Sequence, residues 1–292
     1  MKYLMKNLSS EINQTHYNIT FETKCYENDW EYLLKTNYLD VMIKRCNIIF
    51  DYKQLIINNV NNKDLVRKYA QRKVDKGVID NFYFVDDFIS DALKQFDIDK
   101  TSFGKGYYYS SAELVGIYLT KTKFLVHFSS DSIMPGTFKS KWISSACELL
   151  DSSTKYVVAS ACDYNYGNAI GQSTEPNIGD FIVGYGFSDQ CYLVRTSDFK
   201  SNIYNFKHPD SERYPTYGGE LFEKRVNSFM HVNELLKLTH SEECYRHRNF
   251  PKSESKLIKI ITLSLIRINC YHLIRNLKIY LFRKFKLNQL KA

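Results

Sequence analysis

The chain has 292 residues, 44% hydrophobic and 25% charged, so it can bury one substantial core as ordinary globular proteins do. Its seven cysteines are scattered, odd in number and form no C-x-x-C pair, which argues against a zinc site and a disulfide framework and favours a reducing compartment. The net charge of +8 is uneven, because 256–292 holds six Lys, three Arg and no acid. The rest of the chain is nearly neutral, which argues against a uniformly basic nucleic-acid binder.

Strand-like and helix-like runs alternate along the first two-thirds of the chain. Strands separated by single helices need crossover connections, so the sequence predicts an α/β fold with a mainly parallel sheet flanked by helices. This domain is expected to cover 1–250, with a tail from 251 to 292. The strands are expected at 17–23, 52–58, 82–85, 124–128, 155–161 and within 181–194, and the helices at 30–46, 63–76, 89–96, 110–122, 141–150 and 221–231.

The apolar strand expected at 124–128 runs directly into Ser129, Ser130 and Asp131. Ligands of open α/β sheets collect at the carboxyl ends of strands, and a carboxylate there is suited to hold a divalent cation against phosphates. The alternative is an acid that caps a turn or a helix. The chain has no G-x-G-x-x-G and no G-x-x-x-x-G-K-[ST], so a Rossmann dinucleotide enzyme and a P-loop NTPase are both disfavoured.

In this order of segments the chain resembles GT-A glycosyltransferases, in the manner of family 2 and related bacterial polysaccharide and lipopolysaccharide enzymes. The resemblance places a nucleotide-contacting loop at 19–28, a polar loop at 54–62 and a packed helix at 110–122 before the metal strand. It covers about 17–250. It implies that the nucleotide-sugar is bound by Thr23, Cys25, Tyr26, Asn58, Ser110, Ser129, Ser130 and Asp131.

The Asp-x-Asp motif of that family reads Ser129-Ser130-Asp131 here, so only its last acid is kept. In the family this acid reaches the Mg²⁺ or Mn²⁺ that bridges the diphosphate. Ser129 brings no charge, so we expect the ion to bind weakly without nucleotide. His247, between Arg246 and Arg248, is expected as a second metal or diphosphate ligand; the alternative is a solvated histidine.

The predicted helix at 221–231 follows Gly219 and Glu220, where many GT-A enzymes carry an acidic pair; here Leu221 stands in the second position. Inverting transfer needs a carboxylate that takes the acceptor's proton, and Glu220 is the candidate, with Glu223 in reserve. The alternative for Glu220 is a favourable charge at a helix N-terminus. On the acceptor side the sequence suggests Asp189, Tyr217 and Arg225, with Asp163 as a weaker candidate.

The tail 256–292 mixes apolar runs with cations too often for a spanning helix. It is expected to lie as a basic amphipathic helix on an anionic membrane; the alternative is packing on the domain or on a partner subunit. The first 16 residues contain no apolar signal core. We therefore expect a cytoplasmic protein, peripheral on the inner face of the cell membrane.

These observations predict an enzyme that transfers a sugar, with inversion, from a nucleotide-diphosphate donor to a hydroxyl of a glycan or lipid-linked acceptor in cell-surface polysaccharide synthesis. One alternative is a catalytically decayed glycan- or membrane-binding protein. A nucleotidyltransferase would need a basic Gly-rich loop after the first strand, and none is present. A nucleic-acid partner is not expected, because the tail has few aromatic residues in a stacking pattern.

Overall fold

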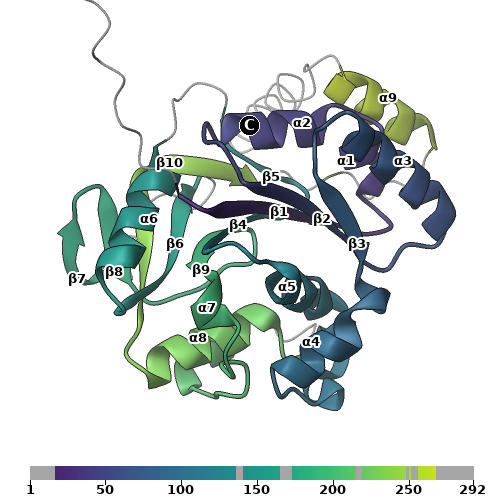
Figure 1. The fold of residues 1–292 in the computed structure, drawn as a ribbon. Helices are drawn as coiled ribbons and strands as arrows, with labels where there is room; N and C mark the ends of the chain where they lie inside the picture. Colours follow the sequence, from purple (N-terminus) through teal and green to yellow (C-terminus); the bar gives the residue numbers. More distant parts are fainter. Residues whose placement is uncertain are drawn as a thin grey trace, which may run out of the picture.

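The computed structural model describes residues 17–135, 141–164, 173–214, 219–247, 250 and 256–267. In this part of the chain one sheet is covered by helices on both faces (Figure 1), in the strand order β3-β2-β1-β4-β9-β6-β10-β8-β7, with β5 paired to β10. The predicted α/β class, with a sheet flanked by helices, is confirmed. The strands are β1 (Ile19–Cys25), β2 (Tyr52–Ile57), β3 (Asn81–Phe84), β4 (Phe124–Phe128), β5 (Ser132–Ile133), β6 (Tyr156–Asp163), β7 (Ser173–Ile178), β8 (Phe181–Gly184), β9 (Cys191–Arg195) and β10 (Leu236–His247).

The sheet has a parallel half and a mixed half. Strands β3, β2, β1 and β4 run parallel to one another. Beyond them β9 runs antiparallel to both β4 and β6, β10 runs parallel to β6, and β8 and β5 run antiparallel to β10. The carboxyl ends of β1, β2, β4, β6 and β10 therefore share one edge of the sheet with the amino end of β9.

The helices form two layers around this sheet (Figure 1). Helices α1, α2, α3 and α6 contribute to one buried apolar cluster, and α4, α5, α7 and α8 contribute to the other. The helical segments are α1 (Trp30–Leu34), α2 (Tyr38–Arg45), α3 (Lys63–Asp75), η1 (Val85–Asp87), α4 (Ile89–Gln95), η2 (Lys100–Gly106), α5 (Tyr107–Leu119), α6 (Trp142–Ser152), α7 (Thr196–Phe199), η3 (Pro209–Arg213), α8 (Phe222–Val232) and α9 (Lys256–Arg267).

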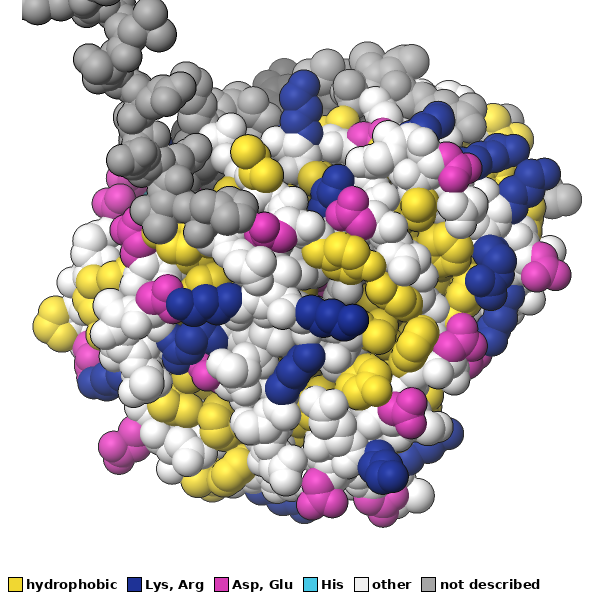
Figure 2. Space-filling view, viewed as in Figure 1, with side chains coloured by type: hydrophobic (Ala, Val, Ile, Leu, Met, Phe, Trp, Pro, Cys, Tyr) yellow, Lys and Arg dark blue, Asp and Glu magenta, His cyan; other side chains and the backbone are white. Residues whose placement is uncertain are grey.

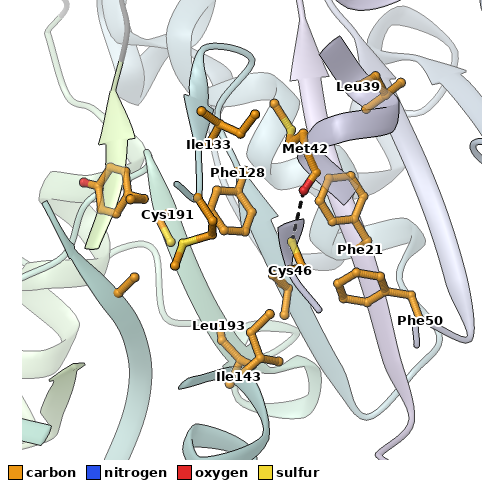
Figure 3. Close-up of a cluster of buried hydrophobic side chains, with 14 of the residues drawn as sticks. Phe21, Leu39, Met42, Cys46, Phe50, Phe128, Ile133, Ile143, Cys191 and Leu193 are labelled. Carbon is orange, nitrogen blue, oxygen red and sulfur yellow. Dashed lines mark hydrogen bonds between the residues drawn. The ribbon is translucent and has the colours of Figure 1, made fainter. Parts of the chain in front are cut away.

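Strand β1 sends alternate side chains to the two layers, as the period of two requires. Phe21 packs on Phe50 and Phe128 with ring centroids 5.3 and 6.4 Å apart, beside Met42 of α2 (Figure 3). In the same view the Cys46 thiol donates a hydrogen bond to the carbonyl of Met42. This apolar layer anchors one face of β1, which leaves the other face for polar side chains.

On the opposite face of β1 lies a buried polar network around Glu22. Gln54 Nε2 donates to Glu22 Oε2 at 2.6 Å, and His127 Nδ1 lies 2.9 Å from Glu22 Oε1. Burial raises the pKa of Glu22 to about 8 and lowers that of His127 to about 3, so the pair is neutral near pH 7. Gly116 of α5 packs directly on the Glu22 carboxylate, where a Cβ would overlap it.

Several elements depart from the sequence prediction, among them β5 and β7, where no strand was expected. The helix expected at 30–46 is divided into α1 and α2. Thr36 lies at the break, where its hydroxyl donates to the carbonyl of Tyr32 and accepts a hydrogen bond from the Tyr38 amide; such local side-chain bonds compete with helical ones. Strand β10 was not predicted, and its pairing with β6 is interrupted between Thr239 and Cys244.

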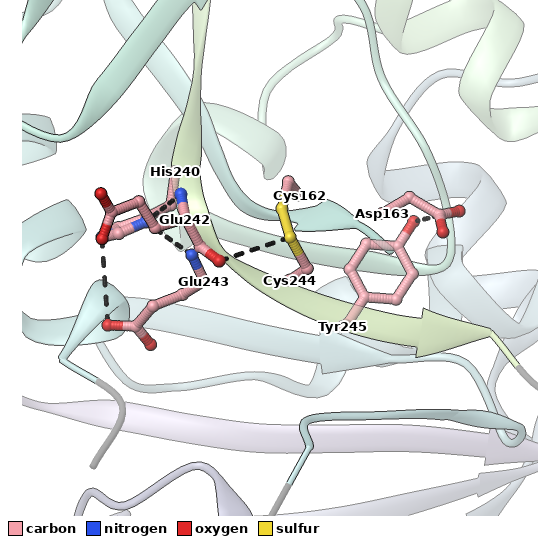
Figure 4. The surroundings of a disulfide bond; sticks show 7 residues. All are labelled: Cys162, Asp163, His240, Glu242, Glu243, Cys244 and Tyr245. Carbon is pink, nitrogen blue, oxygen red and sulfur yellow. Dashed lines mark hydrogen bonds and ion pairs between the residues drawn. A yellow bond between two sulfur atoms is a disulfide. The ribbon is translucent and has the colours of Figure 1, made fainter. Parts of the chain in front are cut away.

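The prediction against disulfide bonding was wrong for one cysteine pair, so the cysteine pattern no longer supports a reducing compartment. Cys162 and Cys244 form a disulfide between the neighbouring strands β6 and β10, where they are also register partners (Figure 4). Their wide separation in sequence concealed this contact. Among the described residues, Cys25, Cys46, Cys147 and Cys191 are buried and free; Cys270 lies outside them.

Of the cationic tail, only α9 lies within the described residues. Leu263 and Leu265 pack against the core cluster that includes α1, while Ile260 and Ile261 are 60% and 49% exposed. Among the described helices, none combines the length and apolar character needed to cross a bilayer. On the face shown in Figure 2, Lys and Arg side chains are interspersed with Asp and Glu.

Candidate active site

A pocket of about 490 Å³ opens at the edge of the sheet where the strand ends meet. Loops after β1, β2 and β4, the residues before β9 and the end of β10 contribute to it, as expected for ligand sites of open α/β sheets. Its lining residues are Lys24, Cys25, Tyr26, Asn28, Asp29, Asn58, Asn59, Tyr108, Tyr109, Ala112, Ser129, Ser130, Asp131, Asp189, Gln190, His247 and Phe250.

Asp131 and His247 meet in this pocket from opposite halves of the sheet. His247 Nε2 lies 3.1 Å from Asp131 Oδ1, and both side chains are mostly buried. Burial alone would raise the pKa of Asp131, but the hydrogen bond and charge of His247 lower it below its usual value. Burial would lower the pKa of His247, but Asp131 raises it. Each group therefore favours the charged form of the other.

The same two atoms fit a divalent cation. Two ligands at right angles around an octahedral ion, each at roughly 2.1 Å, lie about 3 Å apart, close to the observed 3.1 Å. Ser129 Oγ donates to Asp131 Oδ1 at 3.2 Å, which orients the carboxylate. An ion bound here would have one carboxylate and one imidazole from the protein, leaving room for phosphate oxygens.

Asp29 supplies a second buried carboxyl beside the first loop. It accepts hydrogen bonds from the Tyr26 amide at 2.7 Å and from the hydroxyl of Ser130. Burial raises its pKa to about 7. The bond to Ser130 ties the loop after β1 to the loop after β4, so the two walls of the pocket are held together.

Asn58 fixes the third wall. Its Nδ2 donates to the Tyr108 carbonyl at 3.2 Å and to Ser111 Oγ at 3.1 Å, which joins the end of β2 to the start of α5. The rings of Tyr108 and Tyr109, 45% and 50% exposed, stand at the pocket mouth. Exposed aromatic faces next to a polar amide suit a stacked nucleobase.

The floor of the pocket holds an ammonium group between carboxylates. Lys24 Nζ contacts the fully buried Glu113 carboxylate and lies 3.1 Å from Asp189 Oδ2. Burial raises the pKa of Glu223 to about 8, with a further contribution from the Asp189 charge. Asp189 is kept ionised, because Lys24 lowers its pKa against the opposing effect of burial.

Several residues suggested by the sequence lie outside this pocket lining, and Glu223 is one of them, although it adjoins the lining residue Asp189. Glu220 pairs with Lys224 at 2.9 Å, which directs its carboxylate along the surface of α8. Arg225 is buried, donates to the Tyr204 carbonyl and Ser102 Oγ, and stacks on Phe103, so it braces the domain. Tyr217 lies outside the described residues.

Three further residues suggested by the sequence also lie outside the pocket lining. Ser110 Oγ accepts a hydrogen bond from the Phe222 amide at 2.8 Å and so fixes the start of α8. Thr23 is buried within β1. Asp163 receives a 3.4 Å hydrogen bond from Tyr245 near the disulfide (Figure 4). Cys25, Tyr26, Asn58, Ser129, Ser130, Asp131, Asp189 and His247 are the predicted residues that the pocket does bring together.

Sequence reasoning missed Lys24, Asp29 and Glu113. Lys24 lies within a strand and Glu113 within a helix, where charged side chains normally face solvent. Asp29 precedes a helix and is easily mistaken for an N-cap, although its side chain caps no amide of α1. The only available signal for Lys24 was its position one residue before the end of the first strand.

A second group of possible metal ligands lies away from the pocket, at His208, Asp210 and His231. The two imidazole rings stack in parallel, with centroids 4.6 Å apart and an 11° angle between their planes. An imidazole lone pair lies in the plane of its ring. Parallel stacked rings cannot direct their lone pairs at one ion, so this geometry does not favour a metal.

No protein-family model matches the chain, and no curated protein matches it by sequence. Among solved structures, it is similar to residues 1–349 of TarS from S. aureus, with 11% identity, a TM-score of 0.44 and coverage of 87% of this chain and 71% of that one. Glucosyl-3-phosphoglycerate synthase from Mycobacterium tuberculosis, with Mn²⁺, UDP-glucose and phosphoglyceric acid, has 10% identity, a TM-score of 0.44 and coverage of 87% and 78%. Mouse xyloside xylosyltransferase 1 has 11% identity, a TM-score of 0.41 and coverage of 82% and 99%. Similarities this distant do not assign an activity, which has to come from the site.

Proposed function

We propose that this protein is a nucleotide-sugar-dependent glycosyltransferase that uses Mg²⁺ or Mn²⁺. The observation that carries the proposal is the Asp131–His247 pair, 3.1 Å apart at the carboxyl edge of the sheet. It lies in one pocket with the amide of Asn58 and the exposed rings of Tyr108 and Tyr109. A cation site beside an aromatic and amide-lined wall fits the diphosphate and the base of one nucleotide ligand.

Each part of the donor has a matching group. Asp131 and His247 would hold the ion, which neutralises charge on the leaving diphosphate when bound. The nucleoside lies against Tyr26, Asn58 and the tyrosines of α5. The sugar then extends over the pocket floor, away from those walls, toward Lys24 and Asp189.

Glu223 is better placed than Glu220 to take the acceptor's proton. It adjoins Asp189, and a carboxyl with a pKa near the working pH is an efficient general base. As the acceptor oxygen bonds to the anomeric carbon, its proton passes to Glu223 and the diphosphate leaves with the electron pair of the broken bond. A single displacement of this kind inverts the sugar. The acceptor in this proposal is a hydroxyl of a glycan or lipid-linked glycan.

A thermal-shift and calorimetric screen with UDP-, GDP-, CMP- and dTDP-sugars, with and without Mn²⁺, tests the proposal. One nucleotide class should raise the unfolding midpoint only when Mn²⁺ is present. Asp131→Asn should weaken that metal-dependent binding by about 100-fold, the upper end for perturbed metal sites. The matched control is Asp151→Asn, since Asp151 pairs with Lys123 at the other end of β4.

Absence of any nucleotide binding by the folded wild-type protein would overturn the proposal. Equal binding by the wild type and Asp131→Asn would overturn the metal assignment alone. Binding without sugar transfer or donor hydrolysis would favour the alternative of a catalytically decayed binding protein, which the missing first acid at Ser129 keeps open.

The tail 256–292 is proposed to hold the enzyme at an anionic membrane on the cytoplasmic side, where a lipid-linked acceptor would be available. The net positive charge of the tail and the exposed Ile260 and Ile261 support this. Deleting 268–292, which leaves α9 packed on the core, should release the protein from phosphatidylserine vesicles but not change its binding to neutral ones. Unchanged sedimentation with anionic vesicles would contradict the anchor.

A further inference from the structure

The Lys24 ammonium enters the pocket from β1 with one donor that the described residues leave unused. Its side chain is 19% exposed, and described residues engage it at two positions, the buried Glu113 carboxylate and Asp189 Oδ2. An ammonium group has three N–H donors. Glu113 is fully buried, and its Oε2 finds no hydrogen-bond partner among the described residues, so its interaction with Lys24 is the one that fixes the lysine.

Asp189 presents the complementary acceptor beside that donor. Its side chain is 33% exposed, and a carboxylate offers about four lone-pair positions, of which Lys24 occupies one. The neighbouring backbone is also fixed, because the Ser129 amide donates to the Gln190 carbonyl at 2.9 Å. Asp189 is therefore held next to the loop that carries Asp131.

A fixed donor and a fixed acceptor side by side match the hydroxyl groups of a sugar. A hydroxyl can donate and accept, whereas a phosphate or a sugar carboxylate only accepts and would be repelled by Asp189. The charges favour the same ligand, since one ammonium faces the two carboxylates of Glu113 and Asp189. The ionised Asp189 carboxylate opposes a second anion at this position.

We propose that Lys24 and Asp189 bind neighbouring hydroxyl groups of the transferred sugar and select an uncharged sugar over a uronate, with Glu113 as the positioning residue for Lys24. This inference rests on the proposed function and specifies the substrate class of the same site. It draws the sugar contacts from both halves of the sheet, Lys24 from β1 and Asp189 from the residues just before β9.

Calorimetry with Mn²⁺ and the series UDP, UDP-glucose, UDP-galactose and UDP-glucuronate, together with GDP and GDP-mannose, tests it. The readout is the affinity gained by adding the sugar to the diphosphate. Asp189→Asn should reduce that gain about tenfold. It should also reduce the preference against UDP-glucuronate and the difference in affinity between UDP-glucose and UDP-galactose. The affinity for the diphosphate alone should stay within about twofold of the wild type. Asp189→Asn keeps the Lys24–Glu113 contact, so the variant is expected to fold.

Two variants complete the design. Asp198→Asn is the matched control, because Asp198 is a partly buried acid paired with Arg195 at 2.7 Å at the far end of β9; it should leave every affinity unchanged. Glu113→Gln should lower the affinity gained from the sugar by a smaller factor than Asp189→Asn does. It should again leave the affinity for the diphosphate unchanged.

Three outcomes would overturn the inference. The first is an Asp189→Asn variant that keeps the affinity gained from the sugar. The second is a variant that binds the diphosphate and the sugar nucleotide more weakly by the same factor. The third is a wild type that prefers the glucuronate. Each of these leaves the proposed glycosyltransferase standing, since the wild type still binds its nucleotide. A wild type that binds no nucleotide removes both proposals.

Discussion

The two halves of the sheet build the site in different ways. The parallel half contributes loops that directly follow strands, such as Tyr26 after β1, Asn58 after β2 and Ser129 after β4. The mixed half contributes two single side chains. Asp189 lies just before the start of the antiparallel strand β9, and His247 lies at the end of β10. The contribution of the parallel half can therefore be predicted from local sequence. The charged side chains of the mixed half reach the pocket only through pairing between strands that are distant in sequence.

The core of the parallel half should show the largest effect, through Glu22. Its pKa is raised by burial from 4.5 to about 8, so the folded state keeps a proton that the unfolded state loses. The stabilisation that the protonated Glu22 contributes is fully present below pH 4.5 and decreases as the pH rises to about 8. Above that pH it no longer changes. The fall amounts to as much as about 5 kcal/mol.

Urea unfolding of the wild type and Glu22→Gln at pH 5, 7 and 8.5 measures this effect. The variant can keep the hydrogen bond to His127 but does not titrate, so its stability should fall less across this range. The control is Glu31→Gln, since Glu31 is a less buried acid paired with Lys35 at 2.9 Å. Parallel pH profiles for the wild type and Glu22→Gln would show that Glu22 ionises normally and that this half is not held by a protonated carboxyl.

The mixed half should depend instead on its covalent link. Replacing both Cys162 and Cys244 by Ala should lower the free energy of unfolding by about 2–5 kcal/mol. It should also weaken metal-dependent nucleotide binding, because β10 rejoins β6 at Cys244, three residues before His247. Cys147→Ala is the matched control, a buried free cysteine whose loss affects packing alone.

A dithiol reductant provides the internal check on that prediction. It should lower the unfolding midpoint of the wild type and leave that of the double variant unchanged. If the reductant has no effect on the wild type, the link between β6 and β10 is not present in solution, and the contrast between the two halves is lost.

The smallest effect is expected from steric contact within the parallel half. Gly116→Ala should cost about 1–3 kcal/mol, because its Cβ would overlap the Glu22 carboxylate in a packed interior. In a Glu22→Ala background the same change should cost much less, since the space is then open. Equal costs in both backgrounds would mean that α5 can shift away from β1.

Local sequence predicted most of the parallel half because period and strand-end chemistry are local signals. The strand expected at 52–58 is β2 (Tyr52–Ile57), and the helix expected at 63–76 is α3 (Lys63–Asp75). The polar residues expected at strand ends do line the pocket. Glu220 illustrates the limit: its motif position indicated the site, but Lys224 one turn later pairs with its carboxylate.

The mixed half was harder to predict because its pairings are not local. Strand β10 alternates imperfectly and leaves the ladder between Thr239 and Cys244, which removes the period-two signal. His247 was expected as a ligand, but nothing in the sequence indicates that it faces Asp131 across the sheet. Lys24 was passed over because its role depends on Glu113 and Asp189, which come from two other elements.

The link between Cys162 and Cys244 also makes part of the backbone a closed ring, since the two residues are 82 positions apart. The ring contains β7, β8, β9, α7, η3 and α8, and with them Asp189 and Glu223. One proteolytic cut within it leaves both fragments covalently joined. Such a nick is invisible on a non-reducing gel and appears only after reduction, so an apparently intact preparation can carry a cut in the segment that holds Asp189 and Glu223.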